Sequence, residues 1–410
     1  MENLRTIPAL LAAVAAALLL LLAALPANAQ NCARNPDHHR CSGGGDDPGD
    51  GDDGGGDGGG ASPFKPAIVH TVGFNFSRVD LYLLNQDGSE SSVLLEGARS
   101  LGYRGPSWSP DGDAIAFQHN SSGLWTIDID GSNMVQRYEV GDAKKDNESA
   151  IGRVAWHPRG WIAFGVSYTT ADQPRGVFDV FVVADTDSVS DQLTNLTGDF
   201  LGPTDLGIDE PLSLEVDPTW SPDGDRLAMR RLVDMSWPGL AQIVVCRFED
   251  QVQPRLDCEW EDDGYETKPR PLAQAIQLSV PAWHPADDVD RIAYASAPRE
   301  IAGNKPMTEL FITNLMGECE KVLIAGNSNG SDDAGLCPVT FAVSGLTEFF
   351  RSVSWSCDGD SLIVEANGAH GRGLYKVSGF ELPAVEVSPL RFPERNERGV
   401  GSAESRRGCG

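Results

Sequence analysis

Ser-Trp-Ser-Pro-Asp-Gly, residues Ser107–Gly112, is the most informative stretch of this chain, because versions of it return four more times. The tryptophan is present in every copy, and the copies read AWHPRG at Ala155–Gly160, TWSPDG at Thr219–Gly224, AWHPAD at Ala282–Asp287 and SWSCDG at Ser354–Gly359. Proline presets the backbone for the first turn position, aspartate tolerates the second, and glycine supplies the positive φ that closes a hairpin. The repeat therefore predicts a series of tight turns between antiparallel strands.

Apolar segments surround each hexapeptide. The segment AIAF follows the first copy at Ala114, a second strand, GLWTIDIDG, starts at Gly123, and a third, weaker strand closes most units. A sixth unit at the front, from Ala67 to Gly97, lacks the tryptophan segment. β-Branched and aromatic residues mark the strands, and no long segment has helical periodicity. Since a single four-stranded sheet cannot bury both faces, the units predict an all-β, six-bladed β-propeller of four-stranded antiparallel blades.

The ordered set of motifs resembles the repeats of the TolB-like β-propeller family, whose blades carry W-S-P-D-G, then I-A-F, then I-Y-x-x-D-x-D-G. The resemblance extends from Phe64 to Leu390. It implies an exported protein-interaction module. This chain departs from the pattern where His157 and His284 replace the serine and where Cys357 replaces the proline. The stretch after Leu390 is a candidate for the missing inner strand of the first unit, although it reads poorly as a strand, so ring closure stays open.

The N-terminal segment predicts export. An apolar run from Ile7 to Leu25 precedes Ala27-Asn28-Ala29, a sequence that signal peptidase accepts, so residues 1–29 are expected to be a signal peptide. A retained membrane anchor is the alternative. Residues 30–63 are expected to hold a small cysteine loop and a disordered Gly/Asp-rich linker, residues 64–390 the propeller, and residues 391–410 a flexible Arg/Gly-rich tail. The expected location is the periplasm or the outside of the cell, with no membrane span after cleavage.

All eight cysteines follow the expected cleavage site, which fits disulfides in an oxidising compartment. No C-x-x-C pair occurs, and His38-His39 alone lacks the spacing of a zinc site. Although four disulfides allow 105 connectivities, local spacing favours Cys32–Cys41, Cys246–Cys258 and Cys319–Cys337, which leaves Cys357 and Cys409.

The composition is strongly acidic, with 60 Asp and Glu against 32 Lys and Arg and a net charge of −28. Such a surface repels phosphate backbones, which argues against a nucleic-acid partner. A cationic protein is compatible with it, and so is a calcium ion. The D-x-D-x-D-G loop with its distal glutamate is absent, so no resident cofactor is expected beyond that possible calcium.

No catalytic constellation is expected. The chain lacks the G-x-S-x-G elbow of propeller-fused hydrolases, and His157 and His284 fit the start of a hairpin turn better than a metal site. The five repeat tryptophans are expected to anchor blade cores. We therefore expect a non-enzymatic protein-binding module. Two alternatives stay open, a hydrolase or lyase acting on a carbohydrate or peptide in the channel, and a carbohydrate-binding propeller.

Loop lengths point to one binding face. With strands A to D running from the channel outward, the long insertions join B to C or D to the next A, so they share one face. The insertion Thr197–Asp217 is acidic and contains no Lys or Arg. Surface drift and a merely solvated acidic loop are the alternatives. The expected binding residues on this face are Asp205, Asp209, Glu210 and Trp237, with Arg104, Arg153 and Arg351 at the channel rim.

Overall fold

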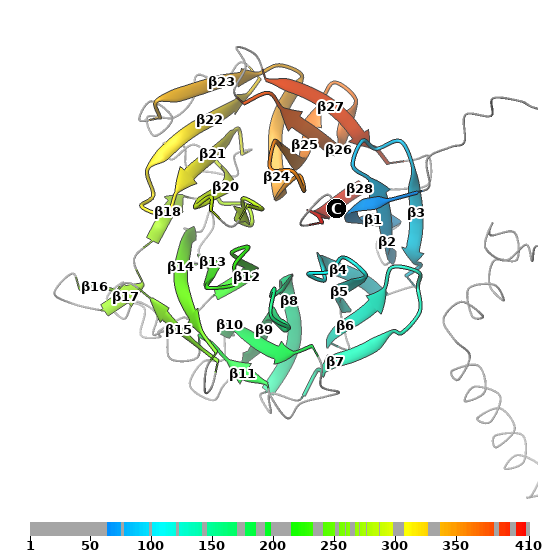
Figure 1. Ribbon diagram of the computed structural model, residues 1–410, viewed down its shortest axis with the longest axis vertical. Coiled ribbons are helices and arrows are strands. Elements are labelled where there is room, and N and C mark those ends of the chain that lie inside the picture. The colour runs from blue at the N-terminus through cyan, green and yellow to red at the C-terminus, as the bar shows by residue number, and fades with distance from the viewer. Residues whose placement is uncertain are drawn as a thin grey trace, which may run out of the picture. The chain divides into compact units, whose positions relative to one another are not determined.

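The computed structural model describes residues 64–74, 78–97, 101–119, 123–141, 146–169, 177–185, 193–197, 215–232, 241–250, 254–258, 260–262, 267–269, 271–275, 277–286, 288–297, 307–326, 337–380, 385–393 and 399–406. The regular structure of these residues is entirely β, and six small sheets form the blades of a propeller (Figure 1). Within these ranges, no helix has the length and apolar character needed to cross a membrane.

Three blades have the expected four strands in chain order from the channel outward. Blade 2 consists of β4 (Leu101–Trp108), β5 (Ala114–His119), β6 (Gly123–Asp128) and β7 (Val135–Glu139). Blade 3 consists of β8 (Asp146–Trp156), β9 (Trp161–Thr169), β10 (Val177–Ala184) and β11 (Thr194–Asn195). Blade 6 consists of β24 (Leu346–Trp355), β25 (Ser361–Gly368), β26 (Gly371–Ser378) and β27 (Glu386–Arg391).

Blades 4 and 5 each carry an additional strand. In blade 4, β12 (Glu215–Trp220), β13 (Arg226–Leu232) and β14 (Ala241–Glu249) are followed by β15 (Arg255–Cys258) and β18 (Pro271–Ala275), which both pair with β14. The hairpin β16 (Trp260–Asp262) and β17 (Thr267–Pro269) lies between them in the chain. Blade 5 has β19 (Ala282–Trp283), β20 (Arg291–Ser296), β21 (Glu309–Asn314), β22 (Cys319–Ala325) and a parallel β23 (Val339–Val343). Strands β18 and β23 lie in the long D–A connections of residues 262–280 and 326–348, so parts of these connections extend sheets.

Blade 1 closes the ring with the end of the chain. Its strands β1 (Pro66–Phe74), β2 (Arg78–Asn85) and β3 (Ser91–Leu95) have β28 (Gly399–Ser405) as their innermost neighbour. Strand β28 is antiparallel to β1, with Ile68 opposite Ser405 and Val72 opposite Val400. The prediction of a flexible tail beyond residue 390 is therefore wrong for the residues of β28. They are ordered because the inner edge of β1 would otherwise be unpaired.

Tryptophan side chains connect the blades. Four indole N–H groups donate to a backbone carbonyl of the preceding blade: Trp108 to Glu404 (3.2 Å), Trp220 to Ala155 (3.0 Å), Trp283 to Thr219 (3.0 Å) and Trp355 to Ala282 (3.2 Å). In the last three cases the acceptor is the residue just before the repeat tryptophan of the preceding blade. Glu404 precedes Ser405, so Ser405 takes the tryptophan position in blade 1. The five repeat tryptophans are at most 7% exposed, which confirms that they are core anchors.

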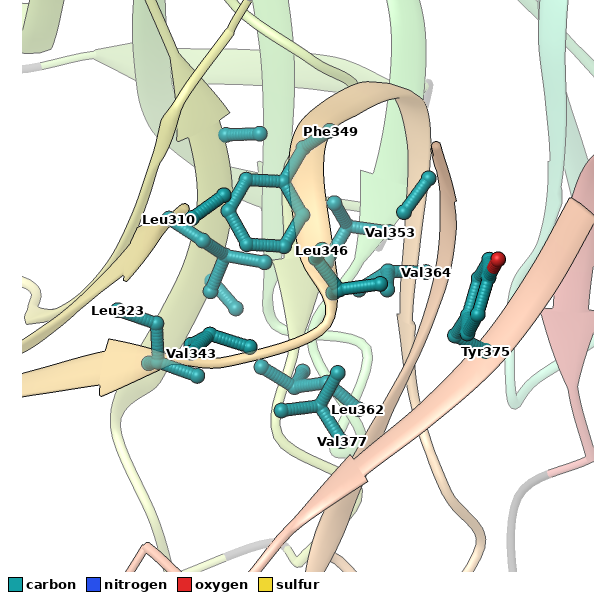
Figure 2. Packing of buried hydrophobic residues seen from close by; sticks show 14 of the residues in the cluster. Leu310, Leu323, Val343, Leu346, Phe349, Val353, Leu362, Val364, Tyr375 and Val377 are labelled. Atoms are coloured by element: carbon teal, nitrogen blue, oxygen red, sulfur yellow. The ribbon is translucent and has the colours of Figure 1, made fainter. Parts of the chain in front are cut away.

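The hydrophobic core is divided among the junctions between blades. In the cluster between blades 5 and 6, Leu310, Leu323 and Val343 face Phe349, Val364 and other residues of blade 6 (Figure 2). Similar clusters join blades 2 and 3, 3 and 4, 4 and 5, and 6 and 1. Burying apolar surface between blades is what makes the separate sheets one body.

We predict that His70 makes the protein sensitive to acid. This residue of β1 is fully buried against Tyr82, with ring centroids 5.6 Å apart. Burial, and then the positive charge of Arg391, lowers the pKa of His70 to about 3 from 6.5. As the pH falls, the imidazole of His70 is protonated in the unfolded chain near pH 6.5 but in the folded protein only near pH 3. The stability that the neutral ring contributes is therefore present above pH 6.5 and is lost as the pH falls toward 3.

The variant His70→Phe should therefore lose less stability than the wild type between pH 7.5 and 4.5, by about 2 kcal/mol. Urea unfolding at several pH values measures this difference directly. Parallel pH profiles for the two proteins would contradict the assignment.

Candidate functional site

Four of the predicted binding residues lie outside the described residues. They are Asp205, Asp209, Glu210 and Trp237, and the predicted pair Cys32–Cys41 lies outside as well. The three predicted arginines are all on innermost strands: Arg104 on β4, Arg153 on β8 and Arg351 on β24. Of the three arginine side chains, the structure describes that of Arg153. The channel around Arg153 is therefore the part of the predicted site that can be built from its contacts.

Arg153 extends from blade 3 to two other blades. Its Nη2 lies 2.9 Å from Glu404 Oε2 in blade 1, and its Nη1 donates to the carbonyl of Val353 in blade 6 at 3.4 Å. The two charged side chains are 12% and 15% exposed. We expected Arg153 to give the channel rim a positive charge, whereas its charge is compensated inside the channel by Glu404.

A second ion pair adjoins the first. Asp217 Oδ2 lies 2.6 Å from Arg230 Nη2, and Asp217 Oδ1 accepts the backbone N–H of Arg153 at 2.8 Å. Arg230 also donates to the carbonyl of Leu278 in blade 5 at 3.2 Å. Asp217 adopts a φ of 55°, an unfavourable angle for a residue with a side chain. These contacts hold Asp217 in that conformation.

Blade 2 completes the arrangement, because Ser107 Oγ donates to Glu404 Oε1 at 3.1 Å. We call Ser107, Arg153, Asp217, Arg230 and Glu404 the channel network. Together with the carbonyls of Val353 and Leu278, it draws on all six blades. Beside it lies a cavity of about 30 Å³, lined by Arg153, Trp283, Trp355 and Arg406 among others. That volume has room for about two water molecules.

The two repeat histidines act within turns. His157 Nδ1 accepts the N–H of Arg159 at 2.9 Å, and His157 Nε2 lies 2.8 Å from the carbonyl oxygen of Gly224 in the next blade. His284 Nδ1 likewise accepts the N–H of Ala286 at 3.3 Å. A Cβ atom at Gly224 or Gly359 would lie 2.5 Å from the histidine of the preceding blade. Each histidine therefore takes the place of the repeat serine and also contacts the neighbouring blade.

One repeat histidine and the distribution of possible metal ligands bear on the chemistry that the described residues can support. Burial, and then the charge of Arg291, lowers the pKa of His284, so its ring is neutral at pH 7. Among the described residues, no group of three or more His, Cys, Asp and Glu side chains is arranged to hold a metal ion.

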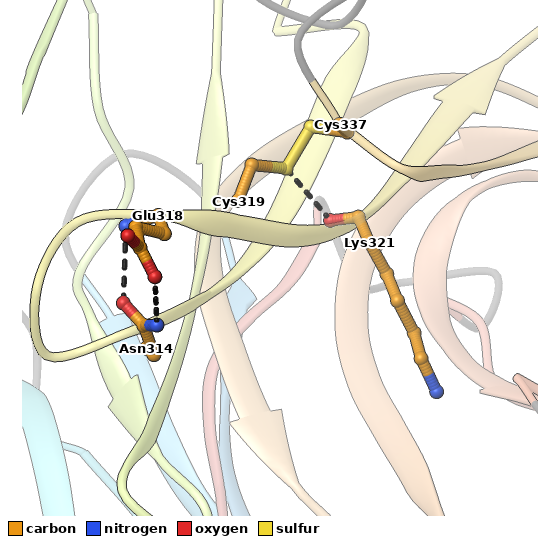
Figure 3. Close-up of a disulfide and its surroundings, with 5 residues drawn as sticks. All are labelled: Asn314, Glu318, Cys319, Lys321 and Cys337. Carbon is orange, nitrogen blue, oxygen red and sulfur yellow. Dashed lines mark hydrogen bonds between the residues drawn. A yellow bond between two sulfur atoms is a disulfide. The ribbon is translucent and has the colours of Figure 1, made fainter.

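Two predicted disulfides are confirmed. Cys246 and Cys258 face each other across β14 and β15 with their Cα atoms 4.3 Å apart. Cys319 and Cys337 have Cα atoms 5.0 Å apart, and they join β22 to the segment that leads into β23 (Figure 3). Beside this disulfide, Asn314 and Glu318 close the β21–β22 turn through hydrogen bonds of 2.8 and 3.0 Å. Cys357 is also disulfide-bonded.

Comparison with solved structures confirms the predicted TolB-like fold. TolB from Acinetobacter baumannii superimposes with a TM-score of 0.52 at 13% identity, over 83% of this chain and 67% of TolB. An oligogalacturonate lyase in complex with manganese gives 0.39 at 13% identity, over 79% and 91% of the two chains. A chain of a mitotic checkpoint complex gives 0.40 at 14% identity, over 79% and 77%. Comparison of the sequence with protein-family models and with curated proteins finds no match.

We predict that the pair of Arg153 and Glu404 is structurally coupled. The variant Arg153→Met leaves a largely buried carboxylate without its cation and should destabilise the protein by about 2 kcal/mol. The double variant Arg153→Met/Glu404→Gln should recover more than half of that loss in urea unfolding. The control is Arg159→Met, which removes the ion pairs of a 46% exposed side chain with Asp225 and Asp250 and should cost about 0–1 kcal/mol. Equal losses from the two single variants would contradict this interpretation.

Proposed function

We propose that this chain is an exported, non-enzymatic β-propeller that binds a protein partner. Binding takes place on the loop face, which we define as the face that carries the B–C and D–A connections. The observation that carries the proposal is the channel network, whose charged side chains are already paired with one another across the ring. The channel then serves as an internal brace, and the loops are left to recognise the partner.

Export is supported by the cysteines. Cys246–Cys258 and Cys319–Cys337 lie in the propeller body, and Cys357 is disulfide-bonded as well. Disulfides of this structural kind persist in oxidising compartments and are rare in the reducing cytosol. We therefore assign the protein to the periplasm or to the outside of the cell.

The choice of the loop face rests on the contrast with the opposite face. There the turns of blades 2, 3, 4 and 6 share one geometry, in which the glycine N–H donates to the residue three positions earlier at 2.9–3.1 Å: Gly112 to Ser109, Gly160 to His157, Gly224 to Ser221 and Gly359 to Ser356. We call this the hairpin-turn face. Uniform turns of this kind serve the fold, whereas the acidic insertion Thr197–Asp217 belongs to the loop face and suits a cationic partner.

We predict that the variant Asp205→Asn/Asp209→Asn/Glu210→Gln captures less partner from the envelope fraction or the culture medium of the source organism. The expected loss is about tenfold or more, because three negative charges are removed while each side chain keeps its size. Its melting temperature should stay within about 2 °C of the wild type, as expected for surface changes. Quantitative pull-down against the wild-type bait, with bound proteins identified by mass spectrometry, measures the effect.

The matched control is Asp111→Asn/Asp223→Asn on the hairpin-turn face. Each aspartate accepts a hydrogen bond from a turn serine, at 2.6 Å from Ser109 and 2.5 Å from Ser221, so this variant should lose stability but not capture. If neither variant alters capture, the loop face is not the binding face. Turnover of an ester, peptide or glycan that a Glu404→Gln change abolishes would instead support the enzymatic alternative.

A further inference from the structure

A cavity of about 280 Å³ lies between blades 5 and 6 on the hairpin-turn face. We call it the blade 5–6 cleft. His284 and Trp355 form its inner wall, with ring centroids 4.8 Å apart at 67°, and Arg291, Lys321 and Asp360 are among its other lining residues. The cleft is separate from the channel network and from the loop face.

At the junction between blades 3 and 4, the position equivalent to this cleft is filled by side chains. There His157 and Trp220 have the same mutual arrangement, 4.6 Å apart at 89°, and the ring of Phe248 packs against both, at 5.3 and 4.7 Å. Trp161 packs against the same cluster. Arg159 covers it from outside through ion pairs with Asp225 and Asp250.

The strand register shows which residues replace these three side chains in the blade 5–6 cleft. Phe248 lies two residues after Cys246, the partner of Leu227, and Gly379 lies two residues after Val377, the partner of the equivalent Leu362. Gly379 therefore stands where Phe248 stands. By the same repeat, Arg291 begins β20 as Trp161 begins β9, and Ala286 follows His-Pro as Arg159 does.

The cleft is thus a space from which two aromatic rings and an arginine are missing. Phe380 also lines the cleft and contacts Trp355 edge-on, but their ring centroids are 6.1 Å apart, farther than the 4.7 Å between Phe248 and Trp220. A planar ring inserted against His284 and Trp355 would restore the three-ring packing of the other junction. Such ring contacts stabilise a complex beyond the burial of apolar area alone.

The outer part of the cleft is lined by two cations, Arg291 and Lys321, and by one carboxylate, that of Asp360. Where the other junction has the indole of Trp161, the cleft has the guanidinium of Arg291, and the side chain of Lys321 lines it too. Arg291 Nε lies 2.5 Å from Glu320 Oε2. A guanidinium carries five N–H donors, so one carboxylate partner leaves donors for a second. Because His284 is neutral, the inner wall against which the ring would pack carries no charge.

We infer that the blade 5–6 cleft binds a planar aromatic ring carrying a carboxylate, with the ring against His284 and Trp355 and the carboxylate at Arg291. Two sources share this chemistry, a free aromatic acid and the C-terminal aromatic residue of a polypeptide. The site goes beyond the partner binding proposed for the loop face.

The test uses the full chain and 3-phenylpropanoate as the probe. Addition of the probe should give saturable NMR shifts of the Trp355 indole N–H and the Gly379 amide, with a Kd of about 1 mM for so small a ligand. The matching alcohol, 3-phenylpropanol, should bind about tenfold more weakly, because it cannot use the charge of Arg291. A tripeptide Gly-Gly-Phe is compared with its C-terminal amide. Tighter binding of the free-acid tripeptide than of the probe identifies a polypeptide C-terminus as the source, and weaker binding identifies a free acid.

Variants that rebuild the filled junction provide the control. Ala286→Arg/Arg291→Trp should reduce affinity for the probe by about tenfold or more while retaining the fold, since Asp360 stands where Asp225 pairs with Arg159. Arg159→Ala, at the other junction, should leave the affinity unchanged. Absence of saturable shifts in the wild type, or equal affinity in the rebuilt variant, would overturn the inference. Loss of capture by the loop-face variant without any change in probe binding separates this site from the proposed function.

Discussion

Four of the junctions between blades depend on how one inner strand bonds to the next. At the junction of blades 2 and 3, Trp156 instead donates to the carboxylate of Asp185. A repeat tryptophan buries its ring at the junction and donates its one N–H to the backbone of the preceding inner strand. The indole has a single donor and no acceptor, so a buried tryptophan of this kind requires a carbonyl in a fixed place. Where the ring closes, the indole N–H of Trp108 donates in the same way to the carbonyl of Glu404 on β28. The C-terminal strand is therefore held by the same kind of bond as β8, β12 and β19.

The same constraint accounts for the channel. Glu404 is placed by its backbone, and its side chain then lies where Arg153 and Ser107 can reach it. Because inner strands from all blades meet here, charges of opposite sign can be paired across the ring. The channel network constrains the blades at their inner strands. Disulfides such as Cys246–Cys258, between β14 and β15, constrain them farther out.

The sequence predicted the blades because turn chemistry and strand alternation are local. The hexapeptide at Ser107–Gly112 specifies its hairpin without help from distant residues, and Cys246 and Cys258 could be paired because their strands are adjacent. The role of β28 stayed open at the level of sequence because the segment Gly399–Ser405 contains no aromatic or bulky β-branched run, and its place is set by backbone pairing with β1. The pairing of Arg153 could not be predicted either, since its partner is 251 residues away. The blade 5–6 cleft could not be predicted from the sequence, because the equivalence of Gly379 and Phe248 follows only from the strand registers of two blades.

Ring closure by β28 is the claim on which the rest depends, and hydrogen exchange of the backbone amides tests it most directly. If β28 is the inner strand of blade 1, its protected amides should exchange as slowly as those of β1, in one cooperative opening of the ring. The same slow rate should appear in the indole N–H of Trp108, whose acceptor lies on that strand. Exchange of the β28 amides at the rate of an unstructured chain, while β1 stays protected, would contradict the account.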